Sequence, residues 1–148
     1  MLATISDPPF IALIDDDEHS AYLLTRMLAA HGAPAIRHYV SAEAGENDLA
    51  AILANPEAAW PSLVIIDLKA HSSANLDFVL RNHNLLRQKG VPLAVMAAPT
   101  DRAGRAALQE AGAAAVFFRQ PELDAYRHEA ASIVSFWARS QCLDAIGM

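Results

Sequence analysis

The sequence predicts an α/β protein with a doubly wound, five-stranded parallel sheet covered by helices on both faces. Three observations lead to this fold class. Apolar runs of strand-forming residues alternate with segments whose apolar residues recur at helical spacing, and the connections between them are short. The chain has 148 residues, 53% of them hydrophobic, which is enough for one core. We therefore expect a single domain over residues 1–148, with its core over about 10–139 and an extended last helix.

The first strand and helix are marked by a sharp change from apolar to acidic residues. Residues 10–14 form a short apolar run that ends in Asp15, Asp16 and Asp17, as a buried strand does when it reaches a polar edge. The residues that follow carry apolar side chains at helical spacing as far as Gly32, which is a typical stop signal. A strand followed by a helix is thus the first unit of the predicted fold.

The same unit repeats along the chain. Residues 35–40 suit a second strand, and Ser41 suits the cap of a helix that Pro56 closes. Residues 62–66 suit a third strand, which again ends in an acid, Asp67. The later expected elements are a helix over 75–89 ended by Gly90, a strand over 91–97, a helix over 101–111, a strand over 113–118 and a helix over about 122–146.

Charge and composition argue against several classes of protein. The formal net charge is -6, so the surface should repel a phosphate backbone, and we expect no direct binding of nucleic acid. The single cysteine, Cys142, cannot form an internal disulfide. Residues 1–10 contain no basic residue and no long apolar run, and no segment approaches the roughly 20 apolar residues of a membrane span. These features predict a cytoplasmic protein that is not bound to a membrane.

The acidic strand ends point to one site. In an open parallel sheet, ligands bind outside the carboxyl ends of the strands, where the strand order reverses. Asp15 and Asp16 follow the first strand and Asp67 follows the third, so we expect their carboxylates to lie within a few ångströms of one another. Such a cluster is tolerable when a hard divalent ion such as Mg²⁺ balances the charge. The alternative is that these acids only solvate the strand end and cap the first helix, which is the role expected of Asp17.

Four segments resemble, in this order, the receiver domain of two-component response regulators: FIALIDDDE, SLVIIDLK, VPLAVMAA and AGAAAVFFRQP. The resemblance covers about residues 10–139 and implies a flavodoxin-like receiver fold. It implies that Asp67 accepts a phosphoryl group from a histidine kinase or a phosphotransfer protein. It also implies that Asp15, Asp16, Asp67 and the backbone carbonyl of Lys69 hold Mg²⁺. The chain would then be a phosphoacceptor signalling domain rather than an enzyme, and its downstream protein partner is not evident from the sequence.

Elementary chemistry agrees with these implied roles. A carboxylate can act as a nucleophile toward phosphorus, and a cation that bridges it to the phosphoryl oxygens offsets the charge that develops during transfer. The acyl phosphate that forms adds negative charge and acceptor oxygens, which can reorder nearby loops and change an outer face. Phosphorylation would then act through protein–protein contacts.

The chain departs from the receiver pattern at the end of the fourth strand. The family has a Ser or Thr where this chain has Ala97, whose side chain cannot form a hydrogen bond with a phosphate. Thr100 comes three residues later and is better suited to cap the fourth helix. The side chain of Lys69 can lend charge to the site, but we expect it to be solvated. The chain is therefore similar to an atypical receiver.

The end of the fifth strand admits two alignments. The family has a Lys there, and that position falls on Arg119 when the alignment is anchored on the Ala-Gly-Ala segment, or on Gln120 when it is anchored on the following proline. The position that is usually aromatic becomes Val116 or Phe117, respectively. We prefer Arg119, because the acidic cluster needs a cation, although a planar guanidinium is not equivalent to an ammonium group.

Other functions and contacts remain as alternatives. A pseudo-receiver that only docks other proteins is favoured by Ala97 and Arg119. A phosphatase of the haloacid dehalogenase type is suggested weakly by Asp15 and Asp17 after a strand, although His19 stands where that family has Thr or Val. The last helix has four large apolar residues that could bind a partner or a second copy in a homodimer, but their helical spacing is typical of core residues. They are Tyr126, Ile133, Phe136 and Trp137.

Overall fold

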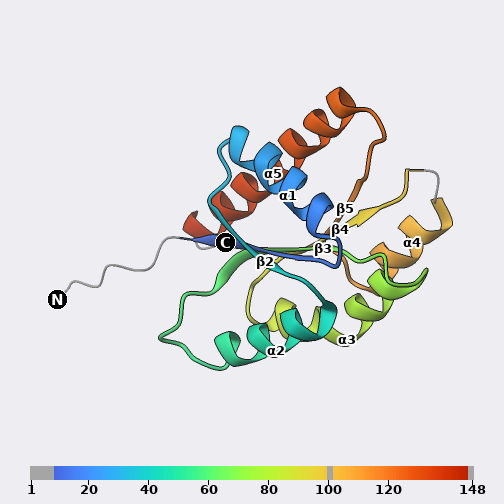
Figure 1. Ribbon diagram of the computed structural model, residues 1–148. Coiled ribbons are helices and arrows are strands. Elements are labelled where there is room, and N and C mark those ends of the chain that lie inside the picture. Colours follow the sequence, from blue (N-terminus) through green and yellow to red (C-terminus); the bar gives the residue numbers. More distant parts are fainter. Residues whose placement is uncertain (1–8, 100–101, 147–148) are drawn as a thin grey trace.

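The computed structural model describes residues 9–99 and 102–146, with side chains described as far as Gln141. It contains a five-stranded sheet in the order β2-β1-β3-β4-β5, in which every neighbouring pair is parallel (Figure 1). The strands are β1 Phe10–Asp15, β2 Ala35–Tyr39, β3 Pro61–Asp67, β4 Leu93–Ala97 and β5 Ala115–Phe118. The helices are α1 Glu18–Ala30, α2 Ala42–Leu53, α3 Ala74–Gln88, α4 Arg102–Ala111 and α5 Leu123–Ile146.

The helices cover both faces of the sheet, as the sequence predicts. Figure 1 shows α1 and α5 on one face and α2, α3 and α4 on the other. Alternate residues of β1 supply the two cores: Ile11 and Leu13 pack with α1 and α5, whereas Ala12 and Ile14 pack with α2, α3 and α4. A central strand that is buried on both sides reads as a continuous apolar run, which explains the pattern in the sequence. The predicted doubly wound α/β class is confirmed.

Two strands begin later than predicted. Val91 and Ala113, the predicted first residues of β4 and β5, still belong to the preceding turns, because their N–H groups donate to carbonyls of the helix before them. Each follows a glycine with positive φ, Gly90 at 73° and Gly112 at 123°. This conformation is open to glycine at little cost and lets the chain reverse before the strand starts. The apolar run in the sequence includes these turn residues, so it overestimates the strand length.

The predicted helix caps are present. The Asp17 carboxylate accepts the backbone N–H of His19 at 3.0 Å and of Ser20 at 3.5 Å, and so caps α1. The Ser41 hydroxyl accepts the N–H of Ala44 at 3.1 Å and caps α2. These contacts fix where both helices start, and in α1 they fix the first turn directly after the acidic strand end.

Helix α5 is fastened to the sheet along its length. Ile133 is fully buried, Tyr126 is 8% exposed, and Phe136 and Trp137 pack partly buried against the α1 face of the core. The Trp137 indole N–H donates to the Ser62 hydroxyl at 2.8 Å. The core role expected for these apolar residues is therefore what the structure shows. In contrast, Leu108 is the one buried residue among those described in α4.

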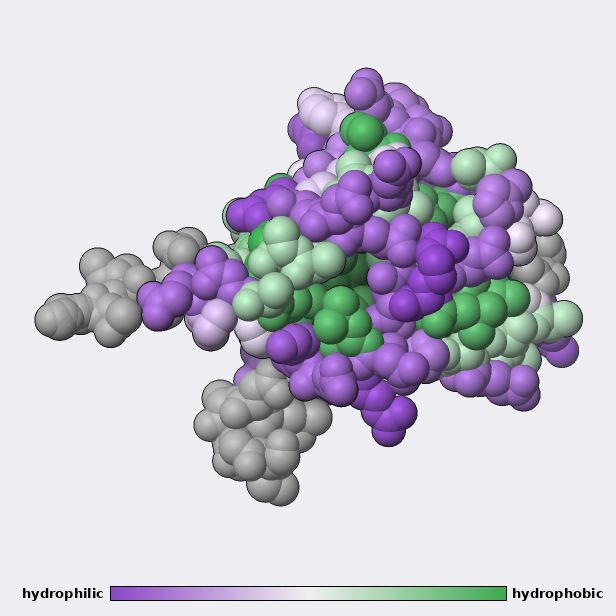
Figure 2. Space-filling view, turned by 90° about the horizontal axis from the view of Figure 1, so that it is seen from below, coloured by the Kyte–Doolittle hydropathy of each residue, from purple (hydrophilic) through white to green (hydrophobic). Residues whose placement is uncertain are grey.

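Apolar groups on the described surface are scattered. The side of the molecule that carries α2 and α3 alternates hydrophilic and hydrophobic areas (Figure 2). Single exposed apolar side chains are ordinary on a protein surface. The large ones are Tyr22, Val40, Leu80 and Leu123, which lie on different elements. Among the described residues, none of the helices is long and apolar enough to cross a membrane.

Candidate functional site

The candidate site lies at the carboxyl ends of β1 and β3, where the strand order reverses. Asp15 is the last residue of β1 and Asp67 is the last residue of β3, and the parallel register pairs them directly. Both side chains are fully buried, with 0% exposure. The third acid predicted for the site, Asp16, follows β1 and is partly exposed. The sheet therefore brings two carboxylates together out of contact with water, an arrangement that requires positive charge nearby.

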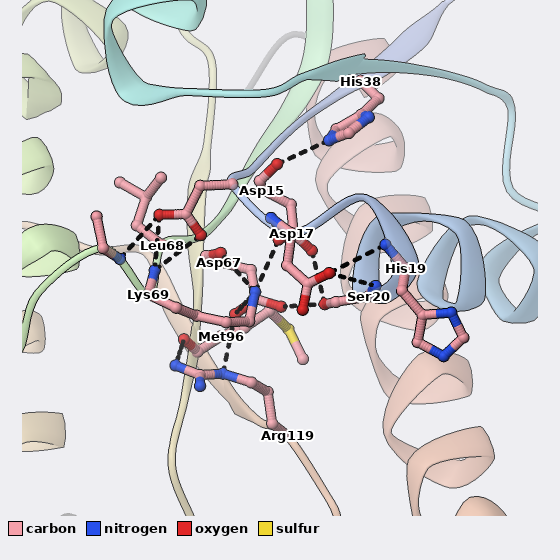
Figure 3. A network of polar contacts seen from close by, with 12 residues as sticks. Asp15, Asp17, His19, Ser20, His38, Asp67, Leu68, Lys69, Met96 and Arg119 are labelled. Carbon is pink, nitrogen blue, oxygen red and sulfur yellow. Dashed lines mark hydrogen bonds and ion pairs between the residues drawn. The ribbon is translucent and has the colours of Figure 1, made fainter.

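Two cationic side chains supply that charge (Figure 3). The Lys69 Nζ atom lies 2.7 Å from Asp15 Oδ1 and 3.2 Å from Asp67 Oδ1, and it also donates to the Asp67 carbonyl at 2.9 Å. The Arg119 Nε atom lies 2.8 Å from Asp67 Oδ1. That last contact lacks hydrogen-bond geometry, so we treat it as an ion pair between two atoms shielded from solvent. We call these four side chains the acid pocket.

Two further side chains hold Asp15 in place. The Ser20 hydroxyl, in the first turn of α1, donates to Asp15 Oδ2 at 2.8 Å and lies 3.3 Å from Asp67 Oδ2. His38 on β2 places Nε2 at 2.8 Å from the Asp15 carbonyl, and it must donate there because a carbonyl can only accept. The end of β1 is thus fixed from α1 on one side and from β2 on the other.

The Asp16 carboxylate is turned toward the loop after β3. Its oxygens accept the backbone N–H of Lys69 at 3.0 Å and of Ala70 at 2.9 Å. These contacts join the ends of β1 and β3 through the main chain. They also position residue 69 so that its side chain can reach back into the acid pocket. Asp16 therefore acts on the loop, while Asp15 and Asp67 face the cations.

The predicted ligand set for Mg²⁺ does not fit the pocket in this arrangement. The Oδ1 atoms of Asp15 and Asp67 are engaged by the Lys69 ammonium group, their Oδ2 atoms accept from the Ser20 hydroxyl, and both oxygens of Asp16 accept backbone N–H groups. Within the described stretches, no three His, Cys, Asp or Glu side chains are grouped as they would be around a metal ion. The negative charges of Asp15 and Asp67 are balanced instead by the side chains of Lys69 and Arg119.

The pKa of Asp67 is raised above that of an ordinary aspartate. Burial is the largest cause, and the negative charge of Asp15 adds to the rise, while Lys69 and Arg119 oppose it. The folded protein therefore binds a proton at Asp67 more readily than the unfolded chain does. Ionised Asp67 is held in the pocket at a cost in stability, which is a common property of functional carboxylates.

This shift predicts a pH dependence of stability. Consider the free energy of unfolding of the wild type relative to Asp67→Asn. As the pH rises above the ordinary pKa of aspartate, this difference should fall, because the unfolded chain loses its proton first and the folded state then binds more protons. The fall should end above the raised pKa of the folded state. Urea unfolding of both proteins over a pH series measures it, and a difference that rose with pH over that interval would contradict the raised pKa.

Comparison with known proteins identifies the fold. No family model and no curated protein matches the sequence. A response regulator receiver domain from Clostridium thermocellum aligns with a TM-score of 0.65 and 14% identity, over 92% of this chain and 99% of that one. The Mn²⁺-bound form of the response regulator Rcp1 aligns with a TM-score of 0.70 and 16% identity, over 88% and 94%. The chain has the receiver fold. A putative response regulator from Chloroflexus aurantiacus also aligns, with a TM-score of 0.66 and 23% identity over 88% and 98%.

The contacts at the end of the fifth strand bear on the two alignments considered for it. Phe118 pairs with Ala97 of β4, and the Arg119 N–H donates to the Ala97 carbonyl at 2.9 Å. The Arg119 side chain then reaches Asp67, as expected of the cation in the receiver pattern. The structure therefore places Arg119 beside the acids, which is what the alignment anchored on the Ala-Gly-Ala segment expects of the residue in the Lys position.

The position of the missing hydroxyl lies beside a hollow. Ala97 is buried at the end of β4 and lines a cavity of about 410 Å³ together with Lys69, Arg119 and Ser73. Thr100, the alternative source of a hydroxyl, lies outside the described residues. The acid pocket thus lies beside a cavity, and at the end of β4 a methyl group rather than a hydroxyl borders that cavity.

Some sequence predictions for this site were wrong or incomplete. Lys69 was expected to be solvated, but its side chain is only 27% exposed and enters the pocket. Ser20 and His38 were missed, because a serine in the first turn of a helix and a histidine on an edge strand are both ordinary surface features. The phosphatase alternative loses its support: Asp17 caps α1, and the His19 ring points away from the acids (Figure 3).

Proposed function

We propose that this chain is a receiver-type signalling module in which Asp67 accepts a phosphoryl group. The observation that carries the proposal is the buried Asp67 carboxylate at the end of β3, with Arg119 at 2.8 Å and Lys69 at 3.2 Å. Asp67 Oδ1 accepts no hydrogen bond among the described residues, so it keeps lone pairs for attack. The two cations can stabilise the charge that develops on the phosphoryl oxygens.

The transfer can be written with residues of this chain alone. An oxygen of Asp67 attacks the phosphorus of a phosphohistidine, the P–O bond forms, the P–N bond breaks, and the leaving imidazole takes up a proton. Asp67 is covered, so a side chain at the mouth must move first. Lys69 is 27% exposed and Arg119 is 32% exposed, and both line the cavity of about 410 Å³. The cavity gives these side chains room to move and offers space for the phosphoryl group.

Magnesium was expected from the sequence, but its predicted ligands are engaged by other groups of the chain, so no step above runs through it. The donor would be a histidine kinase or a phosphotransfer protein, and the signal would pass to another protein through contacts at the surface. On this proposal the chain acts as a phosphoacceptor and not as a turnover enzyme. A homodimer and a cytoplasmic location remain predictions from the sequence.

Labelling with phosphoramidate tests the proposal. Wild type should gain one phosphoryl group on Asp67, located by mass spectrometry of peptides, and Asp67→Asn should gain none because an amide oxygen is a poor nucleophile. Asp17→Asn is the matched control, since Asp17 is exposed and only caps α1. It should be labelled like the wild type. Absence of label in wild type at saturating donor, or label that persists in Asp67→Asn, would refute phosphoryl transfer to Asp67.

A docking module that is not phosphorylated is the second candidate. It is favoured by Ala97, which gives no side-chain hydroxyl at the end of β4, and by the complete burial of Asp67 beneath two cations. In such a protein, the acid pocket would only stabilise the receiver fold. The labelling experiment separates the two functions, because the docking module gives an unlabelled wild type.

A further inference from the structure

We infer that the Lys69 ammonium group is the resident cation of the acid pocket and stands in for the divalent ion that the sequence predicts there. This inference deepens the proposed function and rests on it only for its consequence in phosphoryl transfer. Residue 69 was expected to contribute its backbone carbonyl to a metal site. In the structure it contributes its side chain, whose Nζ atom lies among the oxygens of Asp15 and Asp67.

The geometry around Nζ matches what an ammonium group needs. Three oxygen atoms surround it, namely Asp15 Oδ1 at 2.7 Å, the Asp67 carbonyl at 2.9 Å and Asp67 Oδ1 at 3.2 Å. The ammonium group donates hydrogen bonds to Asp15 Oδ1 and to the Asp67 carbonyl, and its contact with Asp67 Oδ1 is an ion pair. Hydrogen bonds between charged groups are short and strong when both partners are shielded from water. Lys69 is therefore held in the pocket and is not a mobile surface side chain.

The main chain delivers Lys69 to this place. Asp16 accepts the N–H groups of residues 69 and 70, and Asn75 accepts the N–H of Leu68 at 2.9 Å. Three successive N–H groups of the loop are thus fixed by side chains. The acid that was predicted to bind the metal is used to position the lysine that replaces it.

Charge balance opposes a further cation beside Lys69 and Arg119. Asp15 and Asp67 face Lys69 and Arg119, so the buried charges already cancel in pairs. Mg²⁺ would need carboxylate oxygens at about 2.1 Å, and Lys69 already engages one oxygen of each buried carboxylate, while the Ser20 hydroxyl contacts the other. Mg²⁺ and the Lys69 ammonium group would repel each other strongly in a site shielded from water. A divalent ion can enter only after the lysine leaves, so wild type should bind it weakly, and phosphoryl transfer to Asp67 should not depend on it.

Titration with Mn²⁺ alone, followed by the electron paramagnetic resonance signal of the free ion, tests the inference without any phosphodonor. Lys69→Met removes the charge and keeps the length of the side chain. We expect its dissociation constant for Mn²⁺ to be at least about tenfold lower than that of wild type, because buried Asp15 loses its cation and Asp67 keeps only Arg119. Lys89→Met is the matched control, since Lys89 is the other lysine of the chain and its Nζ lies 5.6 Å from the Trp60 ring, at the opposite end of the strands. It should bind like wild type.

The outcomes are distinct. Wild type that binds Mn²⁺ as tightly as Lys69→Met, or a Lys69→Met that binds no better than wild type, overturns the inference. If Lys69→Met folds only when Mn²⁺ is added, as followed by circular dichroism, the ion has replaced the ammonium group and the inference is supported. Lys69→Arg, which keeps the charge, should stay weak, and tight binding by it would count against the inference. Labelling of Asp67 is a separate measurement, so its failure would refute the proposed function and leave the metal result intact.

Discussion

Lys69→Met should lower the free energy of unfolding by about 3 kcal/mol in a buffer free of divalent ions, which is the low end of the cost of breaking a buried ion pair. The low end applies because Lys69 is 27% exposed, whereas Asp15 and Asp67 are fully buried. Without the ammonium group, Asp15 keeps only the Ser20 hydroxyl and the N–H of Asp17 as partners. Urea unfolding followed by circular dichroism measures the change.

A double-mutant cycle shows whether the loss comes from the ion pairs. If it does, the double variant Lys69→Met/Asp15→Asn should be more stable than the sum of the two single losses predicts, because each substitution removes the partner that the other leaves unpaired. Lys89→Met is again the control and should cost well under about 1 kcal/mol, as exposed substitutions usually do. A comparable small loss for Lys69→Met would mean that its side chain is solvated.

Phosphorylation of Asp67 should stabilise Ala97→Thr by about 2 kcal/mol more than it stabilises the wild type. This is the usual contribution of one hydrogen bond to a charged group. The hydroxyl would enter the cavity of about 410 Å³ that Ala97 lines with Arg119. A β-branched residue is also well suited to a strand. The gain is measured as the difference in the free energy of unfolding with and without saturating phosphoramidate, in wild type and variant.

Ala98→Thr is the matched control for this experiment. Ala98 is exposed and borders the same cavity one residue beyond the end of β4, so a threonine there tests whether the hydroxyl must stand at position 97 itself. Ala97→Ser tests the same hydrogen bond with one methyl group less, in case the threonine is too large for its surroundings. An equal gain in Ala97→Thr, Ala98→Thr and wild type would show that the phosphoryl group does not face β4.

The sheet could be predicted from the sequence because its central strands are buried on both faces and end abruptly in acids. The direct pairing of Asp15 and Asp67 follows from that pattern and from the strand order. The choice between Arg119 and Gln120 could not be made in this way, because two local anchors disagree by one residue. It depends on the pairing of Phe118 with Ala97, which is a contact between distant parts of the chain.

The direction of the Lys69 side chain could not be predicted from the sequence for a similar reason. A lysine in a loop is solvated unless something fixes the loop and offers it buried acids. Both conditions are met by residues more than fifty positions earlier, since Asp16 fixes the backbone and Asp15 is the buried acid. Each separate feature is ordinary in the sequence, and only their combination in space determines the site.

The unequal attachment of the two helices next to β5 has a mechanical consequence. Helix α5 is clamped: Glu129 accepts the N–H of Phe118 at 2.6 Å, and Trp137 is bonded to Ser62. Among the described residues of helix α4, Leu108 is the buried one, the Arg105 guanidinium lies 5.4 Å from the Phe118 ring centre, and the helix flanks the cavity beside Arg119. When the Arg119 side chain rearranges, helix α5 is therefore held in place more firmly than helix α4. We expect a movement of Arg119 to shift helix α4 more than helix α5.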